Sequence, residues 1–527
     1  MGRVVFPISC NAPAQQRFTR AMAALHSFWW EEGQAAFQAV ADADSTCAMA
    51  YWGMALNAWG NPFAGGPGGN AGKGDPLRRG AAAAEHAVAL GAATPRERGF
   101  LAAAAALYRG YDSIPNARRL QAYSDTLARV YRDFPGDPEV AISYALSLVE
   151  TASKTDTTFA RQKQAAAILN PLYRRFPDHP GLAHYLIHAN DSPRLATLGL
   201  DAARRYASIA PSAPHAQHMP SHIFVRLGLW DETIAANTRA FEAGLAYARA
   251  HNQPVAPERL HALDYMVYAY LQQGRDRDAR ATVDTAQHLV TETSAADALI
   301  ANYNQIAMEA RLPLERGDWA AAAQLPVRAA ELTIGAALAH FARGIGAARQ
   351  SGGGVGGAGG GGDTAQARLE SAALAAIEAD MTRRGDSEWA RVVGIKRQAV
   401  TAWTELAAGD TAAALRDAKA AADVEDVTEK QPVTPAELLP ARELQADMLL
   451  ATGRYAEARA AYDAALVREP KRARGIYGSA RAAELAGDVA AARRRYAEFV
   501  AQLRAGDGDR VELAQARAAL LRRVPDE

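Results

Sequence analysis

The sequence lacks several features that would place it quickly in a functional class. It has 527 residues but only two cysteines, and 58 Lys and Arg residues are balanced by 58 Asp and Glu residues. A neutral balance argues against nucleic acid as a partner, because proteins that bind it carry a surplus of basic residues to pair with phosphates. No apolar run reaches the roughly 18 residues that a transmembrane helix needs, so we expect no membrane span.

The N-terminus has no apolar segment of signal-peptide length. We therefore expect a soluble protein, which is exported or periplasmic if a signal peptide was removed and cytoplasmic otherwise. Cys10 lies in a nonhelical lead-in and Cys47 at the start of a predicted helix, 37 residues later. Two interpretations stay open: a disulfide that pins the N-terminal strap and implies an oxidising compartment, or two reduced cysteines.

Strand signals are nearly absent, since no segment shows sustained alternation of β-branched residues. Alanine supplies much of the 49% of hydrophobic residues, which favours closely packed helices. Gly453 and Gly487 lie 34 residues apart, and each is followed by small residues and then an aromatic residue. This pattern resembles the tetratricopeptide repeat (TPR), a hairpin of two helices with a glycine in the turn. Further turns of this kind are predicted at Gly228, Gly274, Gly317 and Gly409. We therefore predict an all-α, TPR-like solenoid of helical hairpins.

Two glycine-rich segments interrupt the repeat pattern. Residues 61–76 contain three prolines and six glycines and are interpreted as a loop that could act as a lid. Residues 351–363 read as a flexible linker. The predicted organisation is an N-terminal array over residues 1–350 that contains a histidine-rich site, this linker, and a C-terminal array over residues 364–527.

Histidines are unevenly distributed, because eight of the 12 lie between His179 and His261. Three segments contain six of them: His184-Tyr-Leu-Ile-His188-Ala-Asn-Asp191, His215-Ala-Gln-His218-Met-Pro-Ser-His222, and His261-Ala-Leu-Asp264. Spacings of three and four residues put these imidazoles on shared helical faces. Pro220 predicts a kink within the second segment.

If the three segments open successive hairpins, their helices lie about 10 Å apart and the imidazoles converge. The predicted metal ligands are His184, His188, His215, His218, His222 and His261. Imidazole suits copper, zinc and iron, and we place copper ahead of the other two. Asp191 and Asp264 are predicted to ligate or to orient an imidazole N–H, and Tyr185, Tyr265, Asn57 and Asn61 to line the pocket.

The other six histidines have structural explanations in the sequence. His179 lies in a predicted turn, and His26 is interpreted as a packing residue beside Phe28, Trp29 and Trp30, although it could face the same cavity. A lone helical histidine is more often a hydrogen-bonded structural residue than a ligand, and this interpretation covers His86, His251, His288 and His340.

The phrases at residues 184–191 and 215–224 resemble a poorly characterised bacterial TPR family with the motifs HYLIHxxD and HAxHMPSHIF. The resemblance extends over roughly residues 1–275 and includes the phrases around Cys10 and Cys47. It implies an exported protein, which favours the disulfide, and it brings no defined activity. The phrase Arg259-Leu260-His261 departs from the more acidic, His-containing phrase expected there.

Two functional hypotheses follow. In the first, the histidines hold a transition metal that serves an oxidoreductase or a hydrolase acting on a small-molecule or peptide ligand in the concave groove. In the second, the protein is a scaffold without enzymatic activity: its groove binds a protein or peptide partner, its C-terminal array recruits a partner, and its histidines are hydrogen-bonded within helix contacts.

Overall fold

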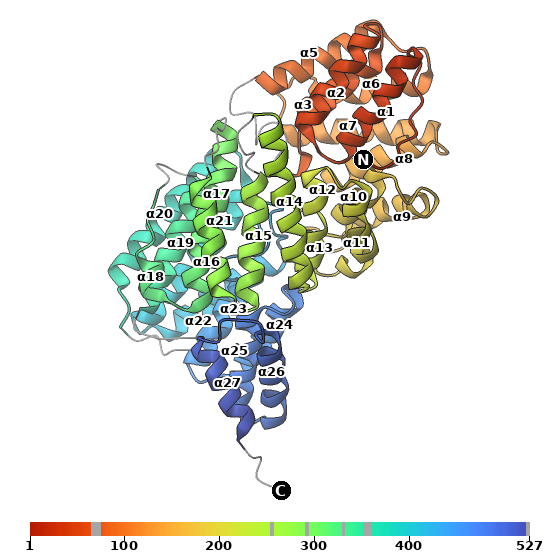
Figure 1. Cartoon of the computed structure of the whole chain (residues 1–527). Helices are drawn as coiled ribbons and strands as arrows, with labels where there is room; N and C mark the ends of the chain where they lie inside the picture. The colour runs from red at the N-terminus through yellow and green to blue at the C-terminus, as the bar shows by residue number, and fades with distance from the viewer. Residues whose placement is uncertain (65–74, 253–257, 290–294, 329–332, 351–360, 523–527) are drawn as a thin grey trace. The chain divides into compact units, whose positions relative to one another are not determined.

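The computed structural model describes residues 1–64, 75–252, 258–289, 295–328, 333–350 and 361–522 (Figure 1). Within these ranges every regular element is a helix, and no helix is both long and apolar enough to span a bilayer. The prediction of an all-α, TPR-like helical-hairpin solenoid is confirmed.

The helices of the first half of the chain are α1 (Ala12–His26), α2 (Trp30–Ala43), α3 (Ala48–Trp59), the 3-10 helix η1 (Pro62–Ala64), α5 (Asp75–Leu90), α6 (Pro95–Tyr108), α7 (Asn116–Asp133), α8 (Pro138–Glu150), α9 (Ala160–Arg175), α10 (Pro180–Asn190), η2 (Ala196–Gly199), α11 (Leu200–Ile209), α12 (Pro214–His218), α13 (Pro220–Arg226) and α14 (Trp230–Ala250). They are followed by α15 (Glu258–Gln272), α16 (Asp276–His288), α17 (Ala295–Arg316), α18 (Trp319–Ala323), α19 (Ile334–Arg349), α20 (Thr364–Arg383), α21 (Ser387–Ala407), α22 (Thr411–Asp426), α23 (Ala441–Ala451), α24 (Tyr455–Arg468), α25 (Ala473–Leu485), α26 (Val489–Gln502) and α27 (Val511–Leu521).

The chain forms two compact units. Unit 1 comprises Met1–Phe224, Ala235–Arg259 and Glu292–Ala298, and unit 2 comprises Val225–Ile234, Leu260–Thr291 and Leu299–Glu527. Within each unit most helices pack on their neighbours in sequence (Figure 1). Such nearest-neighbour packing is the property that defines a solenoid.

The hairpin turns depend on glycine in a left-handed conformation. Gly453, between α23 and α24, has φ +78°, and Gly487, between α25 and α26, has φ +83°. After Gly487, the Asp488 N–H donates to the Ala483 carbonyl oxygen at 2.9 Å, and the Asp488 side chain caps the next helix. One Gly-Asp pair thus ends a helix and begins the next. The other predicted turn glycines have φ between +63° and +91°: Gly228, Gly274, Gly317 and Gly409.

The two glycine-rich segments fall largely outside the described residues. The predicted linker at residues 351–363 does not separate the two units, because α19 and α20 on either side of it both belong to unit 2 and share its core. Glycine content marks a loop but does not tell whether that loop joins domains or neighbouring helices. Of the predicted lid at residues 61–76, the described part contains η1 and the start of α5.

The core of unit 1 begins with the strap that precedes α1. Phe6 from this strap packs with Phe18, Trp52 and Phe100 at ring-centroid distances of 5.1 to 5.8 Å. Burying a side chain of this size contributes about 2 kcal/mol. The strap is therefore part of the core that holds α1 and α3 in place.

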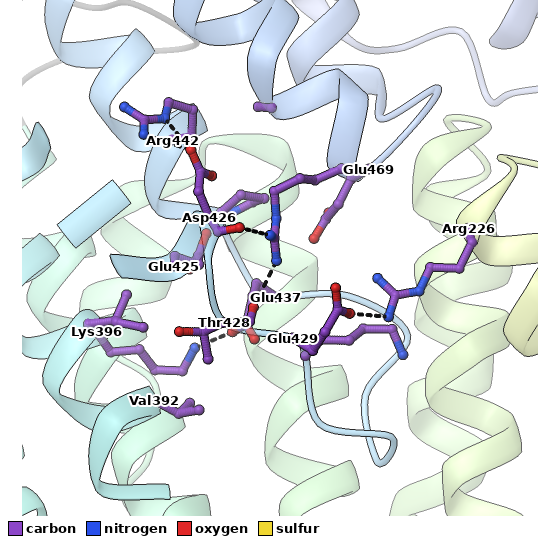
Figure 2. A pocket seen from close by; sticks show the side chains of 15 residues that line it. Arg226, Val392, Lys396, Glu425, Asp426, Thr428, Glu429, Glu437, Arg442 and Glu469 are labelled. Atoms are coloured by element: carbon purple, nitrogen blue, oxygen red, sulfur yellow. Dashed lines mark hydrogen bonds and ion pairs between the residues drawn. The ribbon is translucent and has the colours of Figure 1, made fainter. Parts of the chain in front are cut away.

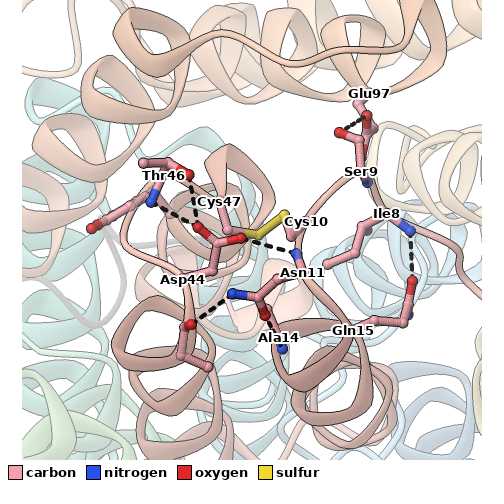
Figure 3. Close-up of a disulfide and its surroundings, with 12 residues drawn as sticks. Ile8, Ser9, Cys10, Asn11, Ala14, Gln15, Asp44, Thr46, Cys47 and Glu97 are labelled. Carbon is pink, nitrogen blue, oxygen red and sulfur yellow. Dashed lines mark hydrogen bonds between the residues drawn. A yellow bond between two sulfur atoms is a disulfide. The ribbon is translucent and has the colours of Figure 1, made fainter.

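Polar contacts fix the same strap (Figure 3). The backbone N–H of Ile8 donates to Gln15 at 2.8 Å, and that of Ser9 donates to Glu97 at 2.6 Å. Next to them the sulfur atoms of Cys10 and Cys47 lie 2.05 Å apart, at disulfide distance. Cys47 is the N-cap of α3, so a bridge here ties the strap to the start of that helix.

We expect the purified protein to contain the Cys10–Cys47 disulfide. A bridge that closes a loop of this length stabilises a protein by about 3 kcal/mol. Replacing Cys47 with Ser is therefore expected to lower the urea concentration at which half of unit 1 is unfolded. A reductant is expected to lower this midpoint by the same amount in the unaltered protein and to leave that of the variant unchanged. Mass spectrometry of unreduced protein provides the direct check, and two alkylatable thiols would contradict the expectation.

Candidate metal centre

Helix α10 carries two of the predicted ligands. Pro180 occupies its first turn, where a missing backbone N–H does no harm, and almost the whole helix is buried. The helix lies close to the end of α1, because a Cβ at Gly181 would come within 2.7 Å of His26. His184 and His188 follow on one face of α10.

The second segment contains the break predicted from Pro220. Helix α12 ends at His218, and α13 begins at Pro220, which has no N–H to continue the hydrogen-bond ladder. His215 and His218 lie on α12, and His222 lies on the first turn of α13. Met219, between the two helices, keeps helical dihedral angles, so the break interrupts the hydrogen-bond ladder between His218 and His222.

Three imidazoles converge at one point. The Nε2 atom of His184 lies 3.1 Å from His188 Nε2 and 3.2 Å from His215 Nε2. Two nitrogens bound to one metal ion at about 2.0–2.1 Å lie roughly 3 to 3.4 Å apart for ligand angles between 90° and tetrahedral. Two of the three pairs thus have the spacing of ligands around a single ion, and the three atoms, all within 4.8 Å of one another, form a group that could hold one.

A second pair of imidazoles lies beside this triad. His218 Nε2 and His222 Nε2 are 3.0 Å apart. The pair and the triad are close, since the ring centroids of His215 and His218 are 6.2 Å apart and those of His188 and His222 are 6.3 Å apart. Five of the six predicted ligands therefore form one cluster within unit 1.

Hydrogen bonds on the opposite ring nitrogens set the orientation of three of these histidines. His184 Nδ1 donates to the backbone carbonyl oxygen of His26 at 2.7 Å. His222 Nδ1 donates to Asp191 at 2.9 Å, and His218 Nδ1 donates to the side-chain oxygen of Asn237 at 2.6 Å. A neutral imidazole has a single N–H, so the Nε2 atom of His184, whose Nδ1 carries that hydrogen, presents a lone pair to the cluster.

This arrangement is poorly satisfied by hydrogen bonding alone. The lone pair of His184 Nε2 accepts one hydrogen well, yet two imidazole nitrogens approach it at similar distances. A metal ion bound to His184, His188 and His215 would accommodate both approaches together.

Burial keeps the triad in the form that binds metals. It lowers the pKa of His184 to about 3. Burial, reinforced by the neighbouring histidines, also holds the pKa values of His188 and His215 well below the usual 6.5. All three are neutral at physiological pH, as ligation requires.

Two aromatic rings cover the triad. The ring of Phe28 lies 4.4 Å from that of His184 and 5.4 Å from that of His215. Phe63, on η1, stacks on His188 at 4.0 Å, and its N–H donates to Asn61 Oδ1. These rings make the surroundings of the cluster largely apolar.

Phe28 occupies the position that other hairpins fill with glycine. It lies between α1 and α2 with φ +49°, and its N–H donates to the Leu25 carbonyl oxygen. The next N–H, of Trp29, donates to the Ala24 carbonyl oxygen, which is the pattern found at Gly487 and Asp488. A bulky residue in this conformation costs about 1–2 kcal/mol. The contacts of its ring with the histidines offset this strain.

A third group of potential ligands is a closed hydrogen-bond network. Glu139 accepts from His26 Nε2 at 3.1 Å and from His179 Nε2 at 2.9 Å, and these two histidines lower its pKa to about 2 although burial opposes the shift. The Tyr185 hydroxyl donates to His26 Nδ1 at 2.9 Å. These atoms are close enough for a metal, but Glu139 and His26 already have partners. The network holds the His26 carbonyl group that orients His184.

Three predicted residues, His261, Asp264 and Tyr265, are on α15 and belong to unit 2. Asp264 forms a fully buried ion pair with Arg311 at 2.7 Å, and its role as a ligand or as an orienting group stays a prediction. His261 as a sixth ligand stays a prediction.

The predicted pocket-lining residues have structural contacts. Asn57 donates to the Trp30 carbonyl oxygen at 3.0 Å, and Asn61 positions Phe63. Tyr265 donates to the Thr434 carbonyl oxygen. Tyr185 lines a cavity of unit 1, and Asp191 orients His222.

Sequence reasoning missed some residues of the site. Phe28, Asn237 and the His26–Glu139–His179 network carried no local signal, since each acts through a partner distant in sequence. The four remaining histidines, which the sequence assigned a structural role, each contact a neighbouring residue. The pairs are His86 with Tyr51, His251 with Tyr247, His288 with Asp284 and His340 with Glu370.

Unit 2 contains a separate charged pocket (Figure 2). Its charged side chains mostly pair with one another: Arg226 with Glu429 at 3.0 Å, and Lys396 with Glu437 at 2.5 Å. Arg468 donates to backbone carbonyl oxygens, including that of Thr428 at 2.9 Å. The pocket is held by internal ion pairs, which explains its charge without a ligand.

Comparison with known proteins does not add a function. No family model matches the chain, and no curated protein matches it. Solved structures similar to it include a monomeric IFIT1 mutant with Gppp-AAAA (11% identity, TM-score 0.33, covering 89% of this chain and 90% of that one) and the human IFIT1 dimer with m7Gppp-AAAA (10%, 0.33, 81% and 86%). Naa15/Naa10 bound to HypK-THB is another (12%, 0.24, 97% and 73%). At such scores these likenesses carry no inference about activity.

The strained turn at Phe28 makes a testable prediction. Phe28→Ala and Phe28→Gly both remove the ring, but only glycine relieves the left-handed strain, so the glycine variant should be the more stable by about 1 kcal/mol. Urea unfolding followed by circular dichroism measures the difference.

Phe37, inside α2, provides the matched control. At this ordinary helical position alanine should be more stable than glycine by about 1 kcal/mol. If alanine is more stable than glycine at both positions, or glycine more stable than alanine at both, the result would contradict a strained turn at Phe28.

Proposed function

We propose that unit 1 binds a transition-metal ion through the Nε2 atoms of His184, His188 and His215, with a second ion at His218 and His222. The observation that carries this proposal is the approach of two imidazole nitrogens to the single Nε2 lone pair of His184, whose Nδ1–H is committed to a backbone carbonyl. One ion satisfies the three nitrogens, whereas one hydrogen bond does not.

The ligand chemistry favours a metal of intermediate softness. All five side chains are imidazoles, and the two cysteine sulfurs lie at bonding distance from each other. Imidazole binds copper, iron and zinc, and copper remains our first choice. Asp191 would orient His222 as a ligand of the metal ion.

A metal ion whose protein ligands leave a coordination position open would allow the protein to act as an enzyme. Three imidazoles leave at least one coordination position for water or substrate, and the bound ion would supply redox or Lewis-acid chemistry. The protein's own contribution is to hold the three imidazoles neutral and to place the rings of Phe28 and Phe63 against them. We therefore propose a metal-dependent oxidoreductase or hydrolase in place of a simple scaffold.

Metal analysis of protein purified without a polyhistidine tag tests the proposal. We expect about one to two equivalents of a transition metal, because five preoriented imidazoles need no folding step before they bind. Less than about 0.2 equivalents of every transition metal, after reconstitution with copper, iron and zinc in turn, would overturn it.

Substitution identifies the ligands. The double variant His188→Ala/His218→Ala is expected to lose the metal, because it removes one ligand from the triad and one from the pair. His288→Ala is the control, since His288 is bonded to the carbonyl oxygen of Asp284 on its own exposed helix face and should leave the metal content unchanged. Full retention of metal by the double variant would show that the ligand set is wrong.

A further inference from the structure

Unit 1 contains a cavity next to the histidine cluster that the metal site does not use. Its volume is about 550 Å³ when the part open to solvent is included. Residues from α1, α2, α3, η1, α6, α7, α8 and α10 line it, together with Phe28. Part of the space is open to solvent, which gives a ligand access to the enclosed part.

The wall of this cavity is rich in aromatic rings. Six of its sixteen lining residues are Phe, Trp or Tyr: Phe28, Trp30, Trp52, Trp59, Tyr123 and Tyr185. Aromatic faces carry a partial negative charge, so a cage of such rings attracts cations and repels anions.

One carboxyl group completes the wall. Glu150, the last residue of α8, lines the cavity and forms no hydrogen bond or ion pair among the described residues. No lysine or arginine belongs to the described residues that line the cavity. Glu150 is half-buried, and a carboxylate without a counter-charge in such a place is costly, so desolvation raises the pKa of Glu150 to about 8.

We infer that this cavity binds a small organic ammonium ion, with the ammonium group at Glu150 and the apolar body against the tryptophan rings. Such a ligand supplies the counter-charge that Glu150 lacks and the cation that the aromatic faces attract. An organic anion is repelled by the carboxylate and by the partial negative charge of the ring faces. A neutral molecule leaves the carboxyl group without a charged partner.

The cavity and the histidine cluster share Phe28, whose ring lines the first and lies 4.4 Å from His184 in the second. One step of the inference rests on the proposed function. With a metal ion at the histidine cluster, this contact makes an organic amine the class of substrate that the cavity presents to the ion. The binding of the amine itself does not require the metal.

Three probes of similar shape and different charge test the inference: 2-phenylethylamine, 2-phenylethanol and 3-phenylpropanoate. Tryptophan fluorescence reports binding, because Trp30, Trp52 and Trp59 line the cavity. We expect the amine to bind at least about tenfold more tightly than the alcohol, and the carboxylate to bind most weakly. Equal affinities for amine and alcohol would overturn the inference.

The isosteric variant Glu150→Gln isolates the carboxyl group. It is expected to weaken amine binding at least about tenfold and to leave alcohol binding unchanged. Glu85→Gln, on the exposed face of α5, is the control and should change neither. Unchanged amine binding in Glu150→Gln would overturn the inference, and if that variant does not fold, the three probes on the unaltered protein decide.

Proton release gives an independent readout. At pH 7 Glu150 is mostly protonated, and pairing with an ammonium ion ionises it, so about one proton leaves per amine bound. Tyr123, Tyr185 and His26 face the same cavity, and burial moves the pKa values of both tyrosines up and that of His26 down, away from neutrality. Calorimetry in buffers of different ionisation enthalpy measures the release, which should be absent in Glu150→Gln.

Each titration is made with protein freed of metal by chelation and with protein loaded with metal. Amine binding without any metal uptake would overturn the proposed function and leave the cavity inference standing. Metal uptake with no preference for the amine would overturn the cavity inference and leave the proposed function standing.

Discussion

The site depends on the hydrogen bond from His184 Nδ1 to the carbonyl oxygen of His26. Since a carbonyl group only accepts, this bond fixes the position of the proton on His184 and turns its Nε2 lone pair toward His188 and His215. The His26 carbonyl is held in turn by the contacts of the His26 ring with Glu139 and Tyr185. A chain of buried hydrogen bonds thus sets the geometry of the cluster before any ion binds.

The same end of α1 explains the strained turn. A repeat hairpin needs a left-handed residue there, and glycine would provide it at no cost. Phe28 instead places an aromatic ring against His184 and along the wall of the cavity. Strain of this kind persists where the surroundings over-determine the conformation, which is common at functional sites. The hairpin architecture and the candidate site therefore meet at this one residue.

Local patterns predicted the fold and most of the cluster. Turn glycines such as Gly453 and Gly487 have the positive φ that their position in the repeat required, and the break at Pro220 follows from its missing N–H. Glu139 and Asn237 were missed because a residue that acts by orienting another carries no periodic signal. Helical spacing relates Asp264 to His261 but cannot reveal its ion-pair partner Arg311, 47 residues away.

The two units treat their buried charges differently. In unit 2 the buried arginines are paired: Arg472 with Glu443 at 2.8 Å, and Arg474 with Asp447 at 2.7 Å. Such pairs satisfy each other and present little to a ligand. In unit 1 the Glu150 carboxyl group and the converging imidazole lone pairs find no such complement within the described chain. A buried polar group left incomplete by its own protein calls for a partner from outside, which we propose to be a cation at both places.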